Sequence, residues 1–135
     1  MKEVNHRKYI KLAKKNLRNS YSPYSGFQVS CMITLKDSRK KFYGVNIENS
    51  SFGVTQCAER VCLSNLISKG LDSKKDIKNI YVTSNSSKSI KPCGLCLQFM
   101  AELVKPDTRI ITCGKNINDY KIYTIKQLLP NAFFL

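Results

Sequence analysis

The stretch IKNIYVTSNSSKSIKPCGLCLQFMAELVKPDTRIITC, residues 77–113, decides the fold class. Its pattern predicts an apolar strand over 77–83, a polar loop over 84–91, a helix from Cys93 to about Val104 and a second strand over 109–113. Pro92 stands at the start of this helix, where a first-turn proline is favoured. A strand, a helix and a strand in this order are typical of an α/β domain.

The segments on either side of this stretch extend the same pattern. They predict an amphipathic helix over 3–19, strands over 27–35 and 41–45 joined by a turn at 36–38, a helix from Cys57 to about Lys69 ended by Gly70, and a strand over 120–124. Helices and strands alternate after the initial hairpin, which predicts a three-layer α/β/α sandwich with a five-stranded mixed sheet. We expect residues 1–135 to form a single domain.

The composition is that of a globular protein. Hydrophobic residues make up 42% of the chain and charged residues 24%, so a packed core can form. No apolar run approaches the length of a membrane span, and the first residues lack the apolar stretch of a signal peptide. We therefore expect a cytoplasmic protein without a membrane partner.

The formal net charge of +14 is high for 135 residues, and such a charge can attract nucleic acid or an acidic surface. The basic residues are mostly lysines spread over the whole chain, with no Arg-rich block and no RNA-recognition motif. This distribution favours a solvated basic surface, and we do not expect a nucleic-acid partner.

The six cysteines point to metal or redox chemistry, because two of them form a Cys-x-x-Cys in a chain without an export signal. Cys93 and Cys96 share one helical face, and Cys57 could complete a set of three thiolates, which favour zinc. Three protein ligands would leave a coordination position for water, as in catalytic sites. The spacing alone leaves open a structural or redox site, with a fourth thiolate from Cys31, Cys62 or Cys113.

Two charged residues lie shortly after Cys57. Glu59 could take a proton from a water activated by the metal and deliver it to a substrate, or it could be a first-turn carboxylate that suits the helix dipole. Arg60 could offset the negative charge of three thiolates, or it could be an ordinary exposed arginine.

Five segments, taken together and in order, resemble one family. They are Ser22-Pro23-Tyr24-Ser25-x-Phe27-x-Val29, Asn46-Ile47-Glu48-Asn49, Cys57-Ala58-Glu59-Arg60, Pro92-Cys93-Gly94-x-Cys96-x-Gln98 and Leu128-Leu129-Pro130-x-x-Phe133. The chain resembles the small cytidine deaminases, the homotetrameric nucleoside-salvage branch of the zinc deaminases. The resemblance covers almost the whole chain and implies a cytidine deaminase-like fold.

The resemblance also implies a role for each matching residue. Cys57, Cys93 and Cys96 would bind one Zn²⁺ per chain, and Glu59 would move protons. The substrate would be held by Phe27 against the base, Asn46 and Glu48 at the ribose hydroxyls, and the backbone N–H of Ala58 at the O2 side of the pyrimidine. Phe133 would reach the active site of a neighbouring subunit, which implies a homotetramer with shared sites.

The implied activity is hydrolytic deamination of cytidine and deoxycytidine to uridine and deoxyuridine with release of ammonia, a step of pyrimidine salvage. The alternatives are a deaminase of cytosine in RNA or of a nucleoside antibiotic, and a basic binding module stabilised by structural zinc. Three features depart from the family pattern. Leu97 stands where arginine is frequent, Phe52 stands where tyrosine is frequent, and the loop Gly53-Val54-Thr55-Gln56 differs from the usual loop before the first ligand.

Overall fold

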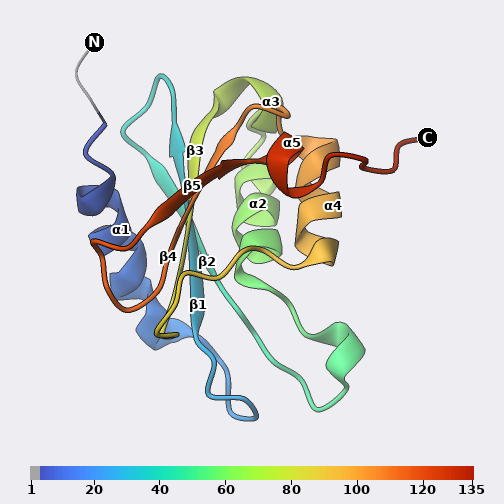
Figure 1. The fold of residues 1–135 in the computed structure, drawn as a ribbon. Coiled ribbons are helices and arrows are strands. Elements are labelled where there is room, and N and C mark those ends of the chain that lie inside the picture. Colours follow the sequence, from blue (N-terminus) through green and yellow to red (C-terminus); the bar gives the residue numbers. More distant parts are fainter. Residues whose placement is uncertain (1–3) are drawn as a thin grey trace.

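The computed structural model describes residues 4–135, and its centre is a five-stranded sheet in the order β2-β1-β3-β4-β5 (Figure 1). The strands are β1 (Val29–Leu35), β2 (Lys41–Val45), β3 (Ile77–Ser84), β4 (Arg109–Cys113) and β5 (Lys121–Thr124). Strand β3 pairs with β4 in parallel, and the other neighbours pair antiparallel. The predicted mixed sheet is therefore confirmed, with each strand beginning and ending within two residues of its expected limits.

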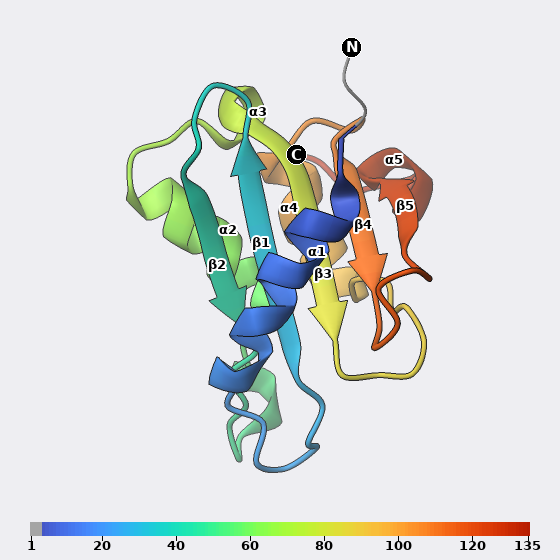
Figure 2. The ribbon, with the colours of Figure 1, turned by 90° about the vertical axis from the view of Figure 1, so that its left-hand side faces the viewer.

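Helix α1 (His6–Lys15) covers one face of the sheet, as Figure 2 shows from that side. Its apolar positions Ile10 and Ala13 are buried against side chains of β1, β3 and β4. The helix was predicted over 3–19, and residue 3 lies outside the described residues. The C-terminal part, Asn16–Asn19, is a 3-10 helix, η1, and not a continuation of the α-helix.

Helices α2 (Ala58–Ser68) and α4 (Gly94–Leu103) cover the opposite face (Figure 1). Side chains such as Leu63, Leu66 and Met100 pack there against Ile33 and Ile80 of the sheet. Apolar side chains thus fill both spaces between helices and sheet, which confirms the three-layer architecture.

Three short elements were not expected: η2 (Phe52–Val54), α3 (Ser73–Asp76) and α5 (Ile125–Leu128). Two of them begin with side-chain caps. The Asp72 side chain accepts hydrogen bonds from the backbone N–H groups of Lys74 and Lys75 at the start of α3. At α5, Thr124 and Gln127 form a capping box.

The two predicted ligand helices begin one residue later than expected, so that Cys57 and Cys93 are the N-cap residues of α2 and α4. Pro92 therefore precedes the N-cap and is not the first helical residue. At the other end of α2, Gly70 adopts a left-handed φ of 77°, and its N–H donates to Ile67, as expected for a helix-ending glycine.

Gly44 of β2 sets how closely α2 approaches the sheet. A Cβ atom at this position would lie 2.4 Å from the backbone N of Cys62 and 2.6 Å from the carbonyl oxygen of Ala58. The absence of a side chain thus allows the first turn of α2, which contains Glu59, to lie directly on β2. Among residues 4–135 no helix has the length and apolar character that crossing a membrane requires.

Candidate metal centre

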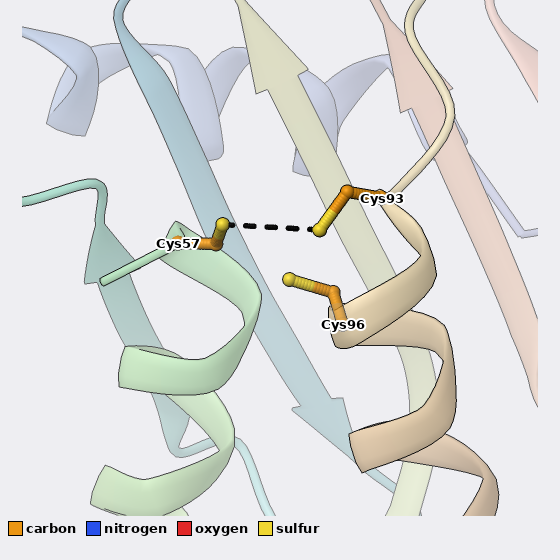
Figure 3. A group of neighbouring side chains, drawn as sticks. All are labelled: Cys57, Cys93 and Cys96. Carbon is orange, nitrogen blue, oxygen red and sulfur yellow. Dashed lines mark hydrogen bonds between the residues drawn. The ribbon is translucent and has the colours of Figure 1, made fainter. Parts of the chain in front are cut away.

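Three cysteine sulfurs converge between the starts of α2 and α4 (Figure 3). The Sγ atoms of Cys57, Cys93 and Cys96 all lie within 4.8 Å of one another, and those of Cys57 and Cys93 are 4.0 Å apart. Four-coordinate zinc with Zn–S bonds of about 2.3 Å places its sulfur ligands about 3.8 Å apart. The donor set and its spacing therefore fit zinc.

The other cysteines are not part of this group. Cys31, Cys62 and Cys113 are buried and form no disulfide. The cluster around Cys57 is the only potential metal site in the described part of the chain. The Cys62 and Cys113 thiols donate instead to backbone carbonyl oxygens. A fourth thiolate, which a closed structural site would need, is not brought to the cluster.

Helix geometry gives the cluster a positive surrounding. Because Cys57 and Cys93 are N-caps, the first backbone N–H groups of α2 and α4 lie beside the sulfurs, where the helix dipole favours negative charge. The Arg60 side chain is held by a 3.0 Å hydrogen bond from Nη2 to the Thr55 carbonyl oxygen, and its Nε is buried without a partner among the described residues.

The sulfurs are not equivalent in acidity. A hydrogen bond with the Cys96 thiol, helped by the guanidinium of Arg60 and opposed by burial, lowers the pKa of Cys57 to about 5. The same hydrogen bond, together with burial, raises the pKa of Cys96. The Cys57 thiol is thus more acidic than that of Cys96, and a metal ion that binds here requires its cysteine ligands as thiolates.

Glu59 lies in the first turn of α2, two residues after Cys57, and only 5% of its surface is exposed. Burial raises the pKa of its carboxyl to about 7. A carboxyl with this pKa is present in both protonation states near neutral pH, so it can both accept and donate a proton. An ordinary first-turn carboxylate would be exposed and would lack this property.

The cluster opens into a cavity of about 260 Å³. Its walls include all of the predicted substrate-binding residues: Phe27, Asn46, Glu48 and Ala58. Glu59, Cys57 and Cys93 line the same cavity. Segments that are far apart in the sequence thus meet at one concave site, next to a metal-binding group and a carboxyl of raised pKa.

Glu48 has one carboxylate oxygen engaged. Its Oε1 accepts hydrogen bonds of 3.2 Å from the backbone N–H groups of Tyr24 and Ser25. The two bonds fix the carboxylate against the loop before β1. Among residues 4–135 no hydrogen bond engages Oε2, which can accept one from a hydroxyl group within the cavity.

The Asn46 side chain makes most of its hydrogen bonds to other residues of the protein, a structural role that the sequence did not indicate. Its Oδ1 accepts from the Val29 N–H at 2.9 Å and from the Ser20 hydroxyl, and its Nδ2 donates to the Phe27 carbonyl oxygen at 2.7 Å. The side chain therefore fixes the segment that carries Phe27. One amide hydrogen of Nδ2 is left for a ligand.

Two further residues acquire roles that sequence reasoning missed. Gln98 holds the C-terminal tail, since its Nε2 donates to the Phe133 carbonyl oxygen at 2.7 Å and its Oε1 accepts from the Phe133 N–H at 3.2 Å. Lys91 lines the cavity, and its ammonium group lies over the Tyr123 ring. Gln98 was part of a recognised motif, whereas nothing in the sequence singled out Lys91.

The sequence matches a known family, described as the cytidine and deoxycytidylate deaminase zinc-binding region, over residues 3–113. A cytidine deaminase of Mycoplasma genitalium is 38% identical over 132 residues, which cover 97% of this chain and 97% of that protein. A cytidine deaminase of Halalkalibacterium halodurans is 40% identical over 124 residues, which cover 92% of this chain and 90% of that protein.

A solved structure supports the same relationship. The crystal structure of the cytidine deaminase from Burkholderia pseudomallei superimposes with a TM-score of 0.89 at 34% sequence identity. The match covers 96% of this chain and 100% of that one. Sequence and fold thus agree over nearly the full length of both chains.

Proposed function

Because the chain belongs to the family of zinc-dependent cytidine deaminases, we propose that it hydrolyses free cytidine and deoxycytidine at C4. Water supplies the oxygen that becomes O4 of the uracil nucleoside, and the C4–N4 bond breaks with release of ammonia. The observation that carries the proposal is the meeting of three cysteine sulfurs with the buried Glu59 in one cavity.

In this proposal Cys57, Cys93 and Cys96 hold the zinc ion. When bound, zinc lowers the pKa of a coordinated water so that a nucleophile is available near neutral pH. Three thiolates outweigh the charge of the ion and would weaken this effect. The guanidinium of Arg60 and the positive ends of the two helix dipoles offset that negative charge. Arg60 does this without a second arginine, because position 97, where the family frequently has arginine, is a leucine.

Glu59 moves the protons. It accepts one from the attacking water, donates one to N3 of the pyrimidine as C4 becomes tetrahedral, and then passes a proton to the amino group that leaves. Its pKa of about 7 supports this role, because a single group must act as base and as acid within one turnover.

The remaining cavity residues orient the nucleoside. Phe27 packs against the base, and the first-turn N–H of Ala58 donates to the O2 side of the pyrimidine. The free Oε2 of Glu48 accepts from the sugar hydroxyls, and Asn46 supplies its one remaining amide hydrogen while it fixes the Phe27 segment. Phe52 stands where the family frequently has a tyrosine, so this position offers no hydroxyl group to the sugar. The Phe52 side chain is 80% exposed and makes no contact within the described chain that would take the place of that hydroxyl.

Glu48 also favours a free nucleoside over a polynucleotide. A carboxylate beside the sugar hydroxyls repels a 3′-phosphate a few ångströms away, and a polymer has such a phosphate at every internal position. Recognition of a base within RNA would instead need contacts to the flanking nucleotides. Of the residues that the structure describes, the cavity walls contain one lysine, Lys91, and no arginine.

The test offers cytidine, deoxycytidine, free cytosine, CMP and a short single-stranded RNA side by side, at low and at moderate salt. We expect turnover of the two nucleosides, little with cytosine or CMP, and none with RNA. RNA as the best substrate, with turnover that falls steeply as salt rises, would replace this function with RNA editing.

The proposal includes a homotetramer in which Phe133 reaches a neighbouring subunit's cavity. The support lies in the tail, where Phe133 is 68% and Phe134 58% exposed although Gln98 holds the backbone of Phe133 in place. Exposed aromatic side chains on a fixed backbone are suited to an interface. A cytoplasmic location belongs to the same proposal and is supported by the cysteines, none of which is in a disulfide in the described structure.

A further inference from the structure

A second cavity, of about 480 Å³, lies outside the proposed active site, and half of its lining residues are cations. Six of its twelve lining residues are basic: Lys8, Lys36, Arg39, Lys40, Lys41 and Lys78. Four of them lie within residues 36–41 of the β1–β2 hairpin, and the fold brings Lys8 of α1 and Lys78 of β3 beside this segment. No acidic residue of the described chain is among the lining residues.

No ion pair within residues 4–135 neutralises these charges. The ion pairs among residues 4–135 are Lys75 with Asp72 and Lys121 with Asp119, and neither involves a lining residue. The Lys41 ammonium donates to the Arg39 carbonyl oxygen at 3.0 Å, which holds it at the cavity without changing its charge. A concave surface lined by one sign of charge concentrates the electrostatic potential and attracts counter-ions.

The cavity lies at the opposite end of the sheet from the metal centre. Val29, at the start of β1, lines the metal-centre cavity, whereas Leu35, at the end of the same strand, lines the basic cavity. Six residues of strand correspond to about 20 Å. In Figure 1 the β1–β2 hairpin accordingly lies at one end of the molecule, and the starts of α2 and α4 lie towards the other. A ligand here would not contact the nucleoside.

We propose that this cavity binds a small polyanion that carries several linked phosphate groups. The six basic side chains supply charge and donors, and Arg39 adds a planar fork suited to a phosphate. Polar groups of Ser38 and Asn79 complete the wall with neutral donors. Ligand binding removes the mutual repulsion of the cations, so it stabilises the folded chain.

The shape of the charge distribution favours a compact ligand over a nucleic acid. The cations surround one bounded cavity, and the aromatic side chain among them, Tyr9, is half-buried with its ring 5.4 Å from that of Tyr81. Single-stranded nucleic acid requires a groove that follows the backbone together with exposed aromatic rings for stacking. A single half-buried ring does not provide such a platform.

The test is calorimetric titration of the zinc-loaded protein with inorganic tripolyphosphate and, separately, with ATP, whose purine base does not suit a pyrimidine pocket. The zinc content is measured before and after, because polyphosphates bind metals. The triple variant Lys36→Gln, Arg39→Gln, Lys40→Gln removes three lining charges. The matched control, Lys105→Gln, Lys115→Gln, Lys126→Gln, removes three exposed charges that do not line the cavity.

We expect saturable binding of one tripolyphosphate to the parent and to the control, and binding at least about tenfold weaker in the cavity variant. All three proteins should deaminate cytidine equally, which shows that the variants are folded. If ATP binds as tightly as tripolyphosphate, the cavity recognises the phosphates alone. If ATP binds more tightly, the polyanion that the cavity recognises is a nucleotide. Equal weakening in both variants, no saturable binding to the parent, or displacement of tripolyphosphate by RNA that binds more tightly would overturn the proposal.

Discussion

The Sγ atoms of Cys57 and Cys93 lie 4.0 Å apart although 36 positions separate the two residues in the chain. Both are helix N-caps, and Cys96 follows one turn into α4. Two helices that pack on the same face of the sheet therefore present three sulfurs to one point (Figure 3).

Metal analysis of the purified protein should find about one zinc per chain. Cys93→Ser should lose most of it, because a hydroxyl is a poor zinc ligand. Cys113→Ser is the control, since the Cys113 thiol already donates to backbone carbonyl oxygens and a serine can do the same. Zinc that survives in Cys93→Ser, or is lost in Cys113→Ser, would refute the ligand assignment.

Glu59→Gln should keep its zinc and its fold but lose on the order of 10² to 10⁴ in kcat, because the amide cannot transfer protons. Steady-state kinetics with cytidine, together with circular dichroism, measure both. Glu102→Gln is the matched control, an exposed glutamate of α4 outside the cavity. A kcat within about tenfold of the parent would reduce Glu59 to a helix-start carboxylate.

Light scattering should report about four chains for the parent. Deletion of residues 132–135, or Phe133→Ala, should lower the activity, because the neighbouring cavity would lose an aromatic wall. Phe134→Ala is the control for the loss of an exposed phenylalanine.

Gln98→Ala tests how the tail is held. It should lower the activity as Phe133→Ala does, since it removes both hydrogen bonds to the backbone of Phe133. A fully active monomer would exclude shared sites.

Gly44→Ala should destabilise the protein by about 1–3 kcal/mol, because the added methyl meets backbone atoms of α2 that cannot rotate away. Gly53→Ala is the control: a Cβ there has no neighbour within 4 Å, and the change should stay within about 0.5 kcal/mol. Urea unfolding of both variants gives the comparison. Since the clash lies at Ala58 and Cys62, Gly44→Ala should also bind zinc more weakly than Gly53→Ala. Equal stability of the two variants would contradict the close contact.

The sequence predicted the strands well because their signals are local. Residues 41–45 and 109–113 alternate or concentrate apolar side chains between polar turns, and the structure has these two strands with the expected limits. Helix α3 was missed because four residues carry no periodicity, and only the cap from Asp72 indicates it. The start of α4 was placed one residue early, since proline is also compatible with the position before an N-cap.

The site was predictable to the extent that each residue has its own motif. Asn46 shows the limit: its motif suggested a ligand contact, but most of its hydrogen bonds go to Phe27, Val29 and Ser20, which tertiary structure alone brings near. The basic cavity was hidden for the same reason. Four of its basic residues are neighbours in the sequence, within 36–41, but only the fold places Lys8 and Lys78 beside them around one cavity.

The 36-residue separation of Cys57 and Cys93 has a consequence for the unfolded chain as well. An ion that joins α2 to α4 is a cross-link, and a cross-link closing a loop of this length restricts the denatured ensemble by roughly 4 kcal/mol in the chain-entropy treatment used for disulfides. The metal-loaded protein should therefore melt at a higher temperature than the chelated one even with no substrate present. Zinc supply in the cell would then govern how long each copy of the enzyme survives, in addition to whether it is active.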